Sequence, residues 1–283
     1  MRILTFDIEE WFHLLDHPAT KTEKEWVNYE IRIHENMENI FNILDMYKVS
    51  ASFFVVGWIA EKYPEVVREI NERGYQIGSH THTHQLAYEQ DRKTFYSDVE
   101  KSIKTIEDCI GKKVELFRAP GFSISENNKW AFEALHELGI TTDSSVFPIK
   151  HGHGGLKCYP SAEPSLLKYN GVTLKEFPVN VHSIMNKPMV FSGGGYFRLL
   201  PYSMIKRATV KSDYVMSYFH PRDFDYEQPL ITDLSSIRRF KSYVGLKSCK
   251  PKLEKWLGDF DFMDIATANE QINWDVKKIA VLD

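Results

Sequence analysis

The chain has 283 residues, of which 43% are hydrophobic, 26% charged and 13% aromatic, and this composition excludes a disordered chain or a collagen-like repeat. Its 35 Lys and Arg face 39 Asp and Glu for a formal net charge of -4, and the sequence has no dense basic block, so nucleic acid is not an expected partner. No apolar run reaches the roughly 18 residues that a transmembrane segment needs.

The cysteines and the first residues bear on the cellular compartment. Cys109, Cys158 and Cys249 are far apart and form no Cys-x-x-Cys pair, which predicts free thiols and a reducing compartment. Residues 1–7 enter a strand-like segment that soon acquires acidic residues, a pattern unlike a signal peptide. We therefore expect a cytoplasmic protein, with a peripheral position at the inner membrane face as a further hypothesis.

The first half of the sequence alternates short apolar runs with helical periodicity. Strands are predicted over 3–6, 51–56, 75–78, 114–117 and 140–144. Apolar residues recur at steps of three and four, which predicts helices over 33–47, 59–70, 95–110 and 127–138. Because strands and helices alternate strictly with short connections, we expect parallel strands joined by right-handed crossovers.

Two architectures fit this alternation, an open doubly wound sheet and a barrel. The Gly-x-Gly-x-x-Gly pattern of a dinucleotide-binding sheet is absent, which favours a barrel. Beyond residue 150 the alternation of strands and helices is less regular. Here we predict a loop over 151–155, a short strand over 176–179, a turn over 192–195, a strand over 214–219 and helices within 233–257. No linker or repeat interrupts the chain, so we predict one domain over residues 1–283, with a helical extension from about residue 230.

Titratable residues follow several of the predicted strands. In a parallel barrel the active site lies at the carboxyl edge of the strands. The strand ends carry Asp7-Ile8-Glu9-Glu10, Ser79-His80-Thr81-His82-Thr83-His84, Arg118-Ala119-Pro120-Gly121 and His220-Pro221. This clustering of acids, imidazoles and a guanidinium predicts a functional site.

The acids and histidines of two strand ends have the spacing of a metal site. Asp7 and Glu9 would leave the same face of an extended strand, and His80 and His84 stand four residues apart. Two histidines and one carboxylate form a facial triad with open coordination positions. The alternative is a solvated strand end and a polar loop. The spacing also leaves open whether Asp7, Glu9 or Glu10 would bind the metal.

At this point the sequence resembles a known family, the polysaccharide deacetylases of the NodB-homology, carbohydrate esterase 4 type, and within it the subgroup associated with exopolysaccharide assembly. The resemblance covers nearly the whole chain and implies an α/β fold, a distorted (β/α) barrel of about seven parallel strands. Its motifs occur in order as Thr5-Phe6-Asp7-Ile8-Glu9, Ser52-Phe53-Phe54-Val55-Val56-Gly57, Gly78-Ser79-His80-Thr81-His82-Thr83-His84, Arg118-Ala119-Pro120, Asp143-Ser144-Ser145-Val146-Phe147-Pro148, Gly193-Gly194-Gly195-Tyr196-Phe197-Arg198 and Tyr218-Phe219-His220-Pro221.

The resemblance also implies roles for individual residues. It makes Asp7 the general base, Arg118 the group that keeps this aspartate ionised and oriented, and His220 the general acid that protonates the departing amine. One divalent metal ion is implied, with zinc preferred and cobalt, nickel, manganese and iron as alternatives. Its ligands would be Glu9, His80 and His84. For the acid beside His220 the sequence offers three alternatives, Asp143, Glu176 and Asp223.

Substrate contacts are expected from Pro120, Gly121 and Tyr196, and a backbone N–H near Gly121 would help to hold the oxyanion. The chain departs from the family pattern in three places. Ile8 separates Asp7 from the next acid, Gly121 replaces a frequent aromatic residue, and Arg222-Asp223 replaces a frequent Trp-Glu pair. Among the remaining histidines, we expect His82 to be structural, and His13, His151 and His153 to lie in polar surface loops near the mouth of the barrel.

The expected activity is metal-dependent removal of the acetyl group from the nitrogen of an amino sugar. The substrate would be an N-acetylated sugar, an oligosaccharide or a glycan precursor. One alternative keeps the metal site but acts on another acyl group or bond, as a deformylase, an O-acetyl esterase or a cyclic-amide hydrolase. A second alternative is a glycan-binding barrel without turnover. The joint presence of base, ligands, Arg118 and His220 speaks against this last reading.

Overall fold

The computed structural model describes residues 1–15, 17–184, 187–231 and 233–282. Its strands are β1 (Arg2–Ile3), β2 (Thr5–Ile8), β3 (Ser52–Val55), β4 (Gln76–Ser79), β5 (Leu116–Phe117), β6 (Thr142–Asp143), β7 (Ser165–Tyr169), β8 (Val172–Glu176), β9 (His182–Ile184), β10 (Lys187–Met189), β11 (Val215–Met216) and β12 (Ile279–Val281). Its α-helices are α1 (Glu23–Trp26), α2 (Ile33–Tyr47), α3 (Gly57–Lys62), α4 (Pro64–Glu72), α5 (Arg92–Ile110), α6 (Trp130–Glu137), α7 (Gly194–Leu199), α8 (Tyr202–Val210), α9 (Ser236–Tyr243), α10 (Leu246–Asp259) and α11 (Ile265–Gln271).

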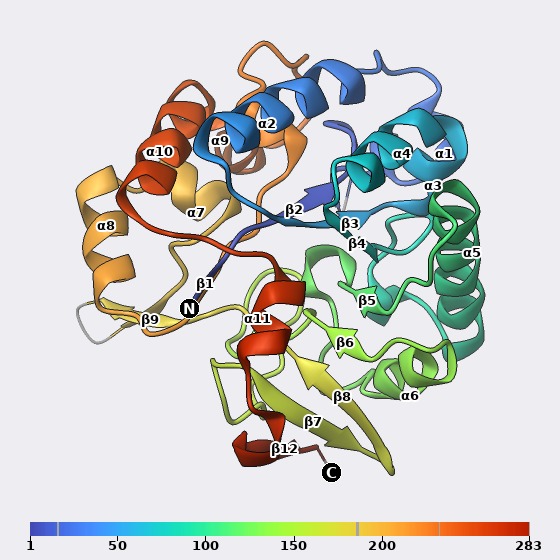
Figure 1. Cartoon of the computed structure of the whole chain (residues 1–283). Helices are drawn as coiled ribbons and strands as arrows, with labels where there is room; N and C mark the ends of the chain where they lie inside the picture. Colours follow the sequence, from blue (N-terminus) through green and yellow to red (C-terminus); the bar gives the residue numbers. More distant parts are fainter. Residues whose placement is uncertain (16, 185–186, 232, 283) are drawn as a thin grey trace.

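Parallel pairing dominates the central sheet. Its strand order is β12-β7-β8-β6-β5-β4-β3-β2, and every neighbouring pair from β2 to β8 is parallel. The antiparallel hairpin β7–β8 and the strand β12 extend one edge (Figure 1). At the other edge β1 pairs in parallel with β11, and Phe6 forms a parallel bridge with Phe219. Only Leu4 separates β1 from β2, so the two form one stretch of chain that pairs with β11 on one side and with β3 on the other. The parallel series therefore extends from β11 to β8.

This arrangement confirms the predicted fold class, a distorted barrel of mostly parallel strands with helices outside. Helices α2 to α6 lie around the outer side of the strands (Figure 1). Among the described residues, the hydrogen-bonded ladder does not close into a complete cylinder. The barrel is therefore open between the β8 side and the segment that follows β10.

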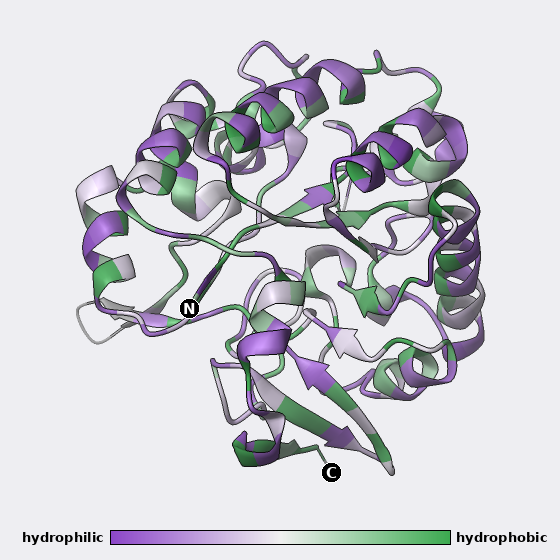
Figure 2. Ribbon diagram, in the orientation of Figure 1, coloured by the Kyte–Doolittle hydropathy of each residue, from purple (hydrophilic) through white to green (hydrophobic). Residues whose placement is uncertain are grey.

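Burial explains why the central strands form. All four residues of β2 and all four of β3 are buried, as expected for strands covered on both faces. The long helix α5 buries one face that includes Phe95, Val99 and Ile106. Asp91 caps its first turn and Gly111, with φ of 66°, ends it. Along the outer helices hydrophilic and hydrophobic residues alternate, as Figure 2 shows.

Several predicted boundaries differ from the structure. The helix predicted over 59–70 is two helices, α3 and α4, because Pro64 starts a new helix at its first position. The strand predicted over 176–179 shares only Glu176 with β8, which ends there. Strand β7, and with it the hairpin β7–β8, has no counterpart among the predicted elements. The C-terminal extension is helical over α9 to α11, but β12 then joins the sheet beside β7. The division into one domain stays a prediction.

No helix in the described part of the chain has both the length and the apolar character that crossing a membrane requires.

Candidate active site

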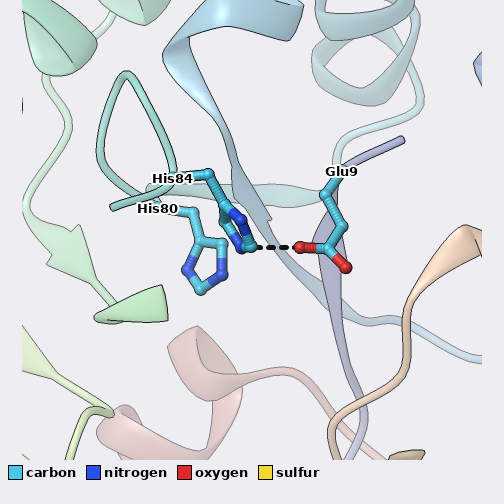
Figure 3. A group of neighbouring side chains, drawn as sticks. All are labelled: Glu9, His80 and His84. Atoms are coloured by element: carbon cyan, nitrogen blue, oxygen red, sulfur yellow. Dashed lines mark ion pairs between the residues drawn. The ribbon is translucent and has the colours of Figure 1, made fainter. Parts of the chain in front are cut away.

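Three possible metal ligands converge at the carboxyl edge of the parallel strands. Glu9 directly follows β2, while His80 and His84 belong to the loop after β4. Their ligand atoms lie within 4.8 Å of one another, and all three residues are buried. The Nε2 atom of His84 lies 2.6 Å from Oε2 of Glu9. Figure 3 shows both imidazoles on one side and the carboxylate pointing toward them from the other.

The protonation states of this cluster suit a cation. Nδ1 of His80 lies 2.7 Å from the carbonyl oxygen of Arg118, so this nitrogen donates and Nε2 keeps its lone pair for a ligand. Burial, followed by the charge of His84, holds the pKa of His80 well below its usual range, so the ring stays neutral. Burial opposes ionisation of Glu9, yet the imidazoles of His84 and His220 lower its pKa. Two imidazole nitrogens and one carboxylate are a donor set that fits a divalent metal ion.

The loop that carries both histidines is held by one carboxylate of α5. Asp98 accepts hydrogen bonds from the backbone N–H of His82 and of Thr83, at 3.1 Å each, and from Oγ1 of Thr83 at 2.7 Å. The loop needs this support because Thr81 and His84 adopt positive φ angles of 63° and 52°, which non-glycine residues rarely adopt. Asp98 thus fixes the loop in the conformation that points two imidazoles at Glu9.

The predicted base, Asp7, forms a buried ion pair with Arg118. Nη1 of Arg118 lies 2.7 Å from Oδ1 of Asp7, and both side chains are buried. The same guanidinium donates to Oγ1 of Thr5 at 2.7 Å and to Oγ of Ser144 at 2.9 Å, and it lies 4.0 Å from the centre of the Phe54 ring. These contacts fix Arg118, and Arg118 in turn fixes the orientation of the Asp7 carboxylate.

The predicted acid faces this base from the other side of the site. Nε2 of His220 lies 3.9 Å from Oδ2 of Asp7. Nδ1 of His220 lies 3.0 Å from Oδ2 of Asp223, which also accepts the backbone N–H of His220 at 2.9 Å. Burial alone would lower the pKa of His220, but the charges of Glu9 and Asp223 and the hydrogen bond to Asp223 outweigh burial and raise it to about 9. The ring therefore carries a proton at neutral pH.

Of the three acids considered as partners of His220, the structure brings Asp223 to it. Asp143 and Glu176 lie opposite each other in the registered pair β6–β8 and are fully buried. Burial and the charge of Asp143 raise the pKa of Glu176 well above its usual range. These two carboxyl groups therefore form a separate buried pair.

Glu10, the third acid at the end of the first strand, has a different environment. Oε1 of Glu10 accepts the backbone N–H groups of Arg32 and Ile33, both at 2.8 Å, at the start of α2. Burial raises its pKa to about 7, although these bonds and one from Trp11 oppose the shift. Glu10 thus supports the N-terminus of α2, while Glu9 belongs to the possible metal cluster.

One expectation for the remaining histidines is wrong. His13 is not in a polar surface loop, because its ring is 2% exposed, packs 4.1 Å from the Trp26 ring and stacks at 5.6 Å on His84. The aromatic residues around it exclude water from this loop. His82 is buried with Nε2 at 3.2 Å from Glu61, outside the cluster of three ligands, as the structural interpretation requires. His151 and His153 are half-buried.

The residues predicted to contact the substrate differ in how exposed they are. Pro120 is buried, whereas Tyr196 on α7 is 46% exposed. Gly121 has φ of 58°, and a Cβ atom there would lie 2.6 Å from Cδ1 of Leu15. The positive φ of Gly121 is a backbone conformation that favours glycine. The contacts of these three residues with a substrate stay predictions.

Comparisons with known proteins agree with this geometry. Residues 13–142 match the family model described as polysaccharide deacetylase, and residues 144–270 match a model described as a domain of unknown function (DUF3473). A peptidoglycan-N-acetylglucosamine deacetylase of Bacillus cereus is 28% identical over 127 residues, which are 44% of this chain and 46% of that protein. The deacetylase PgdA of Listeria monocytogenes is 30% identical over 101 residues, 36% of this chain and 20% of that protein. The matches thus span less than half of these relatives.

Solved structures show the same fold. A Mycobacterium smegmatis protein assigned as a polysaccharide deacetylase superposes with a TM-score of 0.64 at 18% identity, over 98% of this chain and 91% of that one. A carbohydrate esterase 4 pseudoenzyme from Bacillus anthracis gives a TM-score of 0.50 at 11% identity, over 94% of this chain and 64% of that one. Residues 13–142 thus resemble the polysaccharide deacetylase family, and the whole chain shares the fold of these solved structures.

Sequence reasoning missed three residues that shape this site. Asp98 lies 16 positions after His82 on an amphipathic helix, where an acid resembles any solvated helix residue. Arg198 stands in a quoted motif, but the sequence gives it no partner. The burial of His13 could have been anticipated from Trp11 and Phe12 beside it, because adjacent aromatic residues after a buried strand favour a packed loop.

Proposed function

We propose that this chain is a metal-dependent hydrolase that removes the acetyl group from the nitrogen of an amino sugar in a glycan or its precursor. The observation that carries the proposal is the convergence of three groups: the cluster of Glu9, His80 and His84, the Asp7–Arg118 pair, and the His220–Asp223 pair. A divalent ion in this cluster, preferably zinc, would act as a Lewis acid toward the acyl oxygen and acidify the attacking water.

The two titratable groups beside the cluster divide the proton transfers. Arg118 binds Oδ1 of Asp7, so Oδ2 is left to accept the proton of the water that attacks the amide carbon. His220, held through Nδ1 by Asp223, donates its Nε2 proton to the sugar nitrogen as the C–N bond breaks. The 3.9 Å between Nε2 of His220 and Oδ2 of Asp7 supports a base and an acid that act on the same amide. The products are acetate and a free amino sugar.

The identity of the glycan is proposed more coarsely. The relatives named above act on N-acetylglucosamine in peptidoglycan, which supports an N-acetylhexosamine as the unit that this site processes. The half-exposed ring of Tyr196 would stack on the apolar face of a pyranose at the mouth. The assignment to exopolysaccharide assembly and the cytoplasmic or membrane-peripheral location stay predictions.

The test is a metal-loaded activity screen across nucleotide-linked, lipid-linked and oligomeric N-acetylhexosamines. Free amine and acetate should appear in equal amounts, and chelation should abolish both. Release of formate, or of acetate without free amine, would support a deformylase or an O-acetyl esterase instead. A protein that binds glycan but releases nothing with any metal would be a binding barrel, as the pseudoenzyme of the same fold illustrates.

A further inference from the structure

A buried chain of charged groups continues behind His220. Oδ2 of Asp223 contacts Nδ1 of His220 at 3.0 Å, while Oδ1 of the same carboxylate lies 3.1 Å from Nε of Arg198. Asp223 is 2% exposed and Arg198 is 7% exposed, so water screens these charges little. The carboxylate therefore bridges the predicted acid and a buried guanidinium.

The other end of Arg198 is anchored to α9. Its Nη1 atom donates to the carbonyl oxygen of Ser242 at 2.8 Å, and its Nη2 atom donates to that of Lys241 at 3.0 Å. These are carbonyls of the last turn of α9, which have no partner within the helix and carry partial negative charge. Arg198 thus connects the end of a peripheral helix to the carboxylate that orients His220.

Helix α7, which carries Arg198, is fixed at both ends. At its start, a Cβ atom on Gly193 would lie 2.2 Å from the carbonyl oxygen of Tyr218, so only glycine lets α7 approach the strand that leads to His220. At its end, Nζ of Lys252 on α10 donates to the carbonyls of Phe197 at 2.8 Å and Leu200 at 3.1 Å. The position of Arg198 is therefore set by both the strand and the C-terminal helices.

We propose that Arg198 is a positioning residue for the general acid, and that the region from α7 to α10 serves to hold the chain Arg198–Asp223–His220 in place. This inference rests on the proposed function. It gives a role to the stretch 144–270, matched by a model of unknown function, since Arg198, Asp223 and His220 all fall within it. The metal-ligand loop falls within 13–142.

The chemistry makes the proposal specific to one step. Without Arg198, Oδ1 of Asp223 loses its charged partner, and the carboxylate is held to His220 through Oδ2 alone, so its orientation toward Nδ1 is less fixed. His220 would then present Nε2 less well to the departing nitrogen. An amide needs this proton because an amine anion is a very poor leaving group. An activated aryl acetate does not need it because its phenolate leaves unprotonated.

The experiment compares two substrates on the metal-loaded protein, an N-acetylhexosamine oligomer and an aryl acetate, with metal content measured in parallel. Arg198→Met should lower kcat for the amide by about 10- to 100-fold, less than the 10²–10⁴-fold expected for loss of the acid itself. The same variant should keep KM, metal content and aryl acetate turnover within about threefold of the wild-type values. Arg198→Lys keeps a cation but loses the planar fork, so its kcat for the amide should lie between those of wild type and Arg198→Met.

Arg222→Met is the matched control. Arg222 is equally buried and reaches the same Ser242 carbonyl, at 3.4 Å, so its removal disturbs the same region. It should not show the amide-selective loss. Equal losses on both substrates, or an amide-selective loss in Arg222→Met as well, would contradict the positioning role. A wild-type protein that is inactive on every N-acetyl substrate would instead contradict the proposed function. In that event proton NMR of the His220 Nδ1–H decides the inference, because the resonance should move in Arg198→Lys and an unmoved resonance refutes the role.

Discussion

The two halves of the site are built in different ways. On the metal side, β2, β3, β4 and β5 are consecutive neighbours, and each functional side chain lies in a strand or just after its end. On the acid side, β11 has two residues, and His220 is held by polar contacts that reach α7 and α9. Regular strand alternation positions the first half, whereas buried charge pairs position the second. Loss of a ligand on the first side should therefore affect metal binding, whereas changes on the acid side should affect proton transfer and leave the metal in place.

The largest expected effect lies on the metal side. His80→Ala removes one of three ligands, so the protein should lose its metal and at least roughly 10³-fold in activity. Metal analysis after dialysis, with deacetylase rates, checks this outcome. His82→Ala is the matched control in the same loop, and it should keep the metal because its Nε2 atom faces Glu61. Full metal occupancy in His80→Ala would remove this histidine from the site.

Asp7→Asn tests whether base and ligands are separate groups. The variant should retain metal but lose about 10²–10⁴-fold in kcat, the range for a general base. An asparagine keeps the size of the side chain and can still accept the Arg118 hydrogen bond. If the substitution empties the metal site instead, Asp7 is a ligand and the division of roles between Asp7 and Glu9 must be exchanged.

A smaller effect should follow from loosening the histidine loop. Asp98→Ala removes the acceptor of three hydrogen bonds, so metal affinity should fall about 10- to 100-fold, as for other groups that orient ligands. Activity at saturating metal should stay near wild type. Calorimetric titration of the metal-free protein measures the affinity. Asp108→Ala, an exposed position on the same helix, should change nothing, and an equal loss there would assign the effect to α5 as a whole.

The smallest expected effect is on pH-dependent stability. Because the pKa of His220 is raised from 6.5 to about 9, its contribution to folding is fully present below pH 6.5 and is lost as pH rises through 9. The pKa of Asp223 is lowered from 3.8 to about 2, so its contribution is present above pH 3.8 and is lost as pH falls through 2. Urea unfolding of the metal-free protein between pH 4 and 9 should show a decline of at most about 3 kcal/mol on the alkaline side. A double variant His220→Gln/Asp223→Asn should lack this decline.

The contrast between the halves also explains what could be predicted from the sequence. Periodicity located α2, α5, β3 and β4 within a few residues, because their apolar faces are continuous and their ends carry turn residues such as Gly111. It missed the hairpin β7–β8, whose strands alternate buried and exposed residues only in part. It also joined α3 and α4, since their apolar residues keep one phase across Pro64.

The metal side of the site could likewise be predicted from the sequence, whereas the acid side could be predicted only in part. The spacing of His80 and His84 after one strand and of Glu9 after another was enough to predict a shared cluster, because parallel strands end at a common edge. No local pattern could select Asp223 over Asp143 or Glu176 as the partner of His220. That choice depends on long-range packing, which places Asp143 and Glu176 against each other.

The pair of acids after β2 has a consequence for how this sequence can change. Glu9 reaches the imidazoles, while Glu10, one position later, holds the amino end of α2. Inserting a single residue before Glu9 would move Glu9 to the position of Glu10, and deleting one would move Glu10 to the position of Glu9. The helix would lose its carboxylate acceptor in the same event that misplaced the ligand, so local folding and chemistry would fail together. The register of this short segment is therefore under two constraints at once, and variation in loop length should be tolerated elsewhere around the barrel mouth before it is tolerated here.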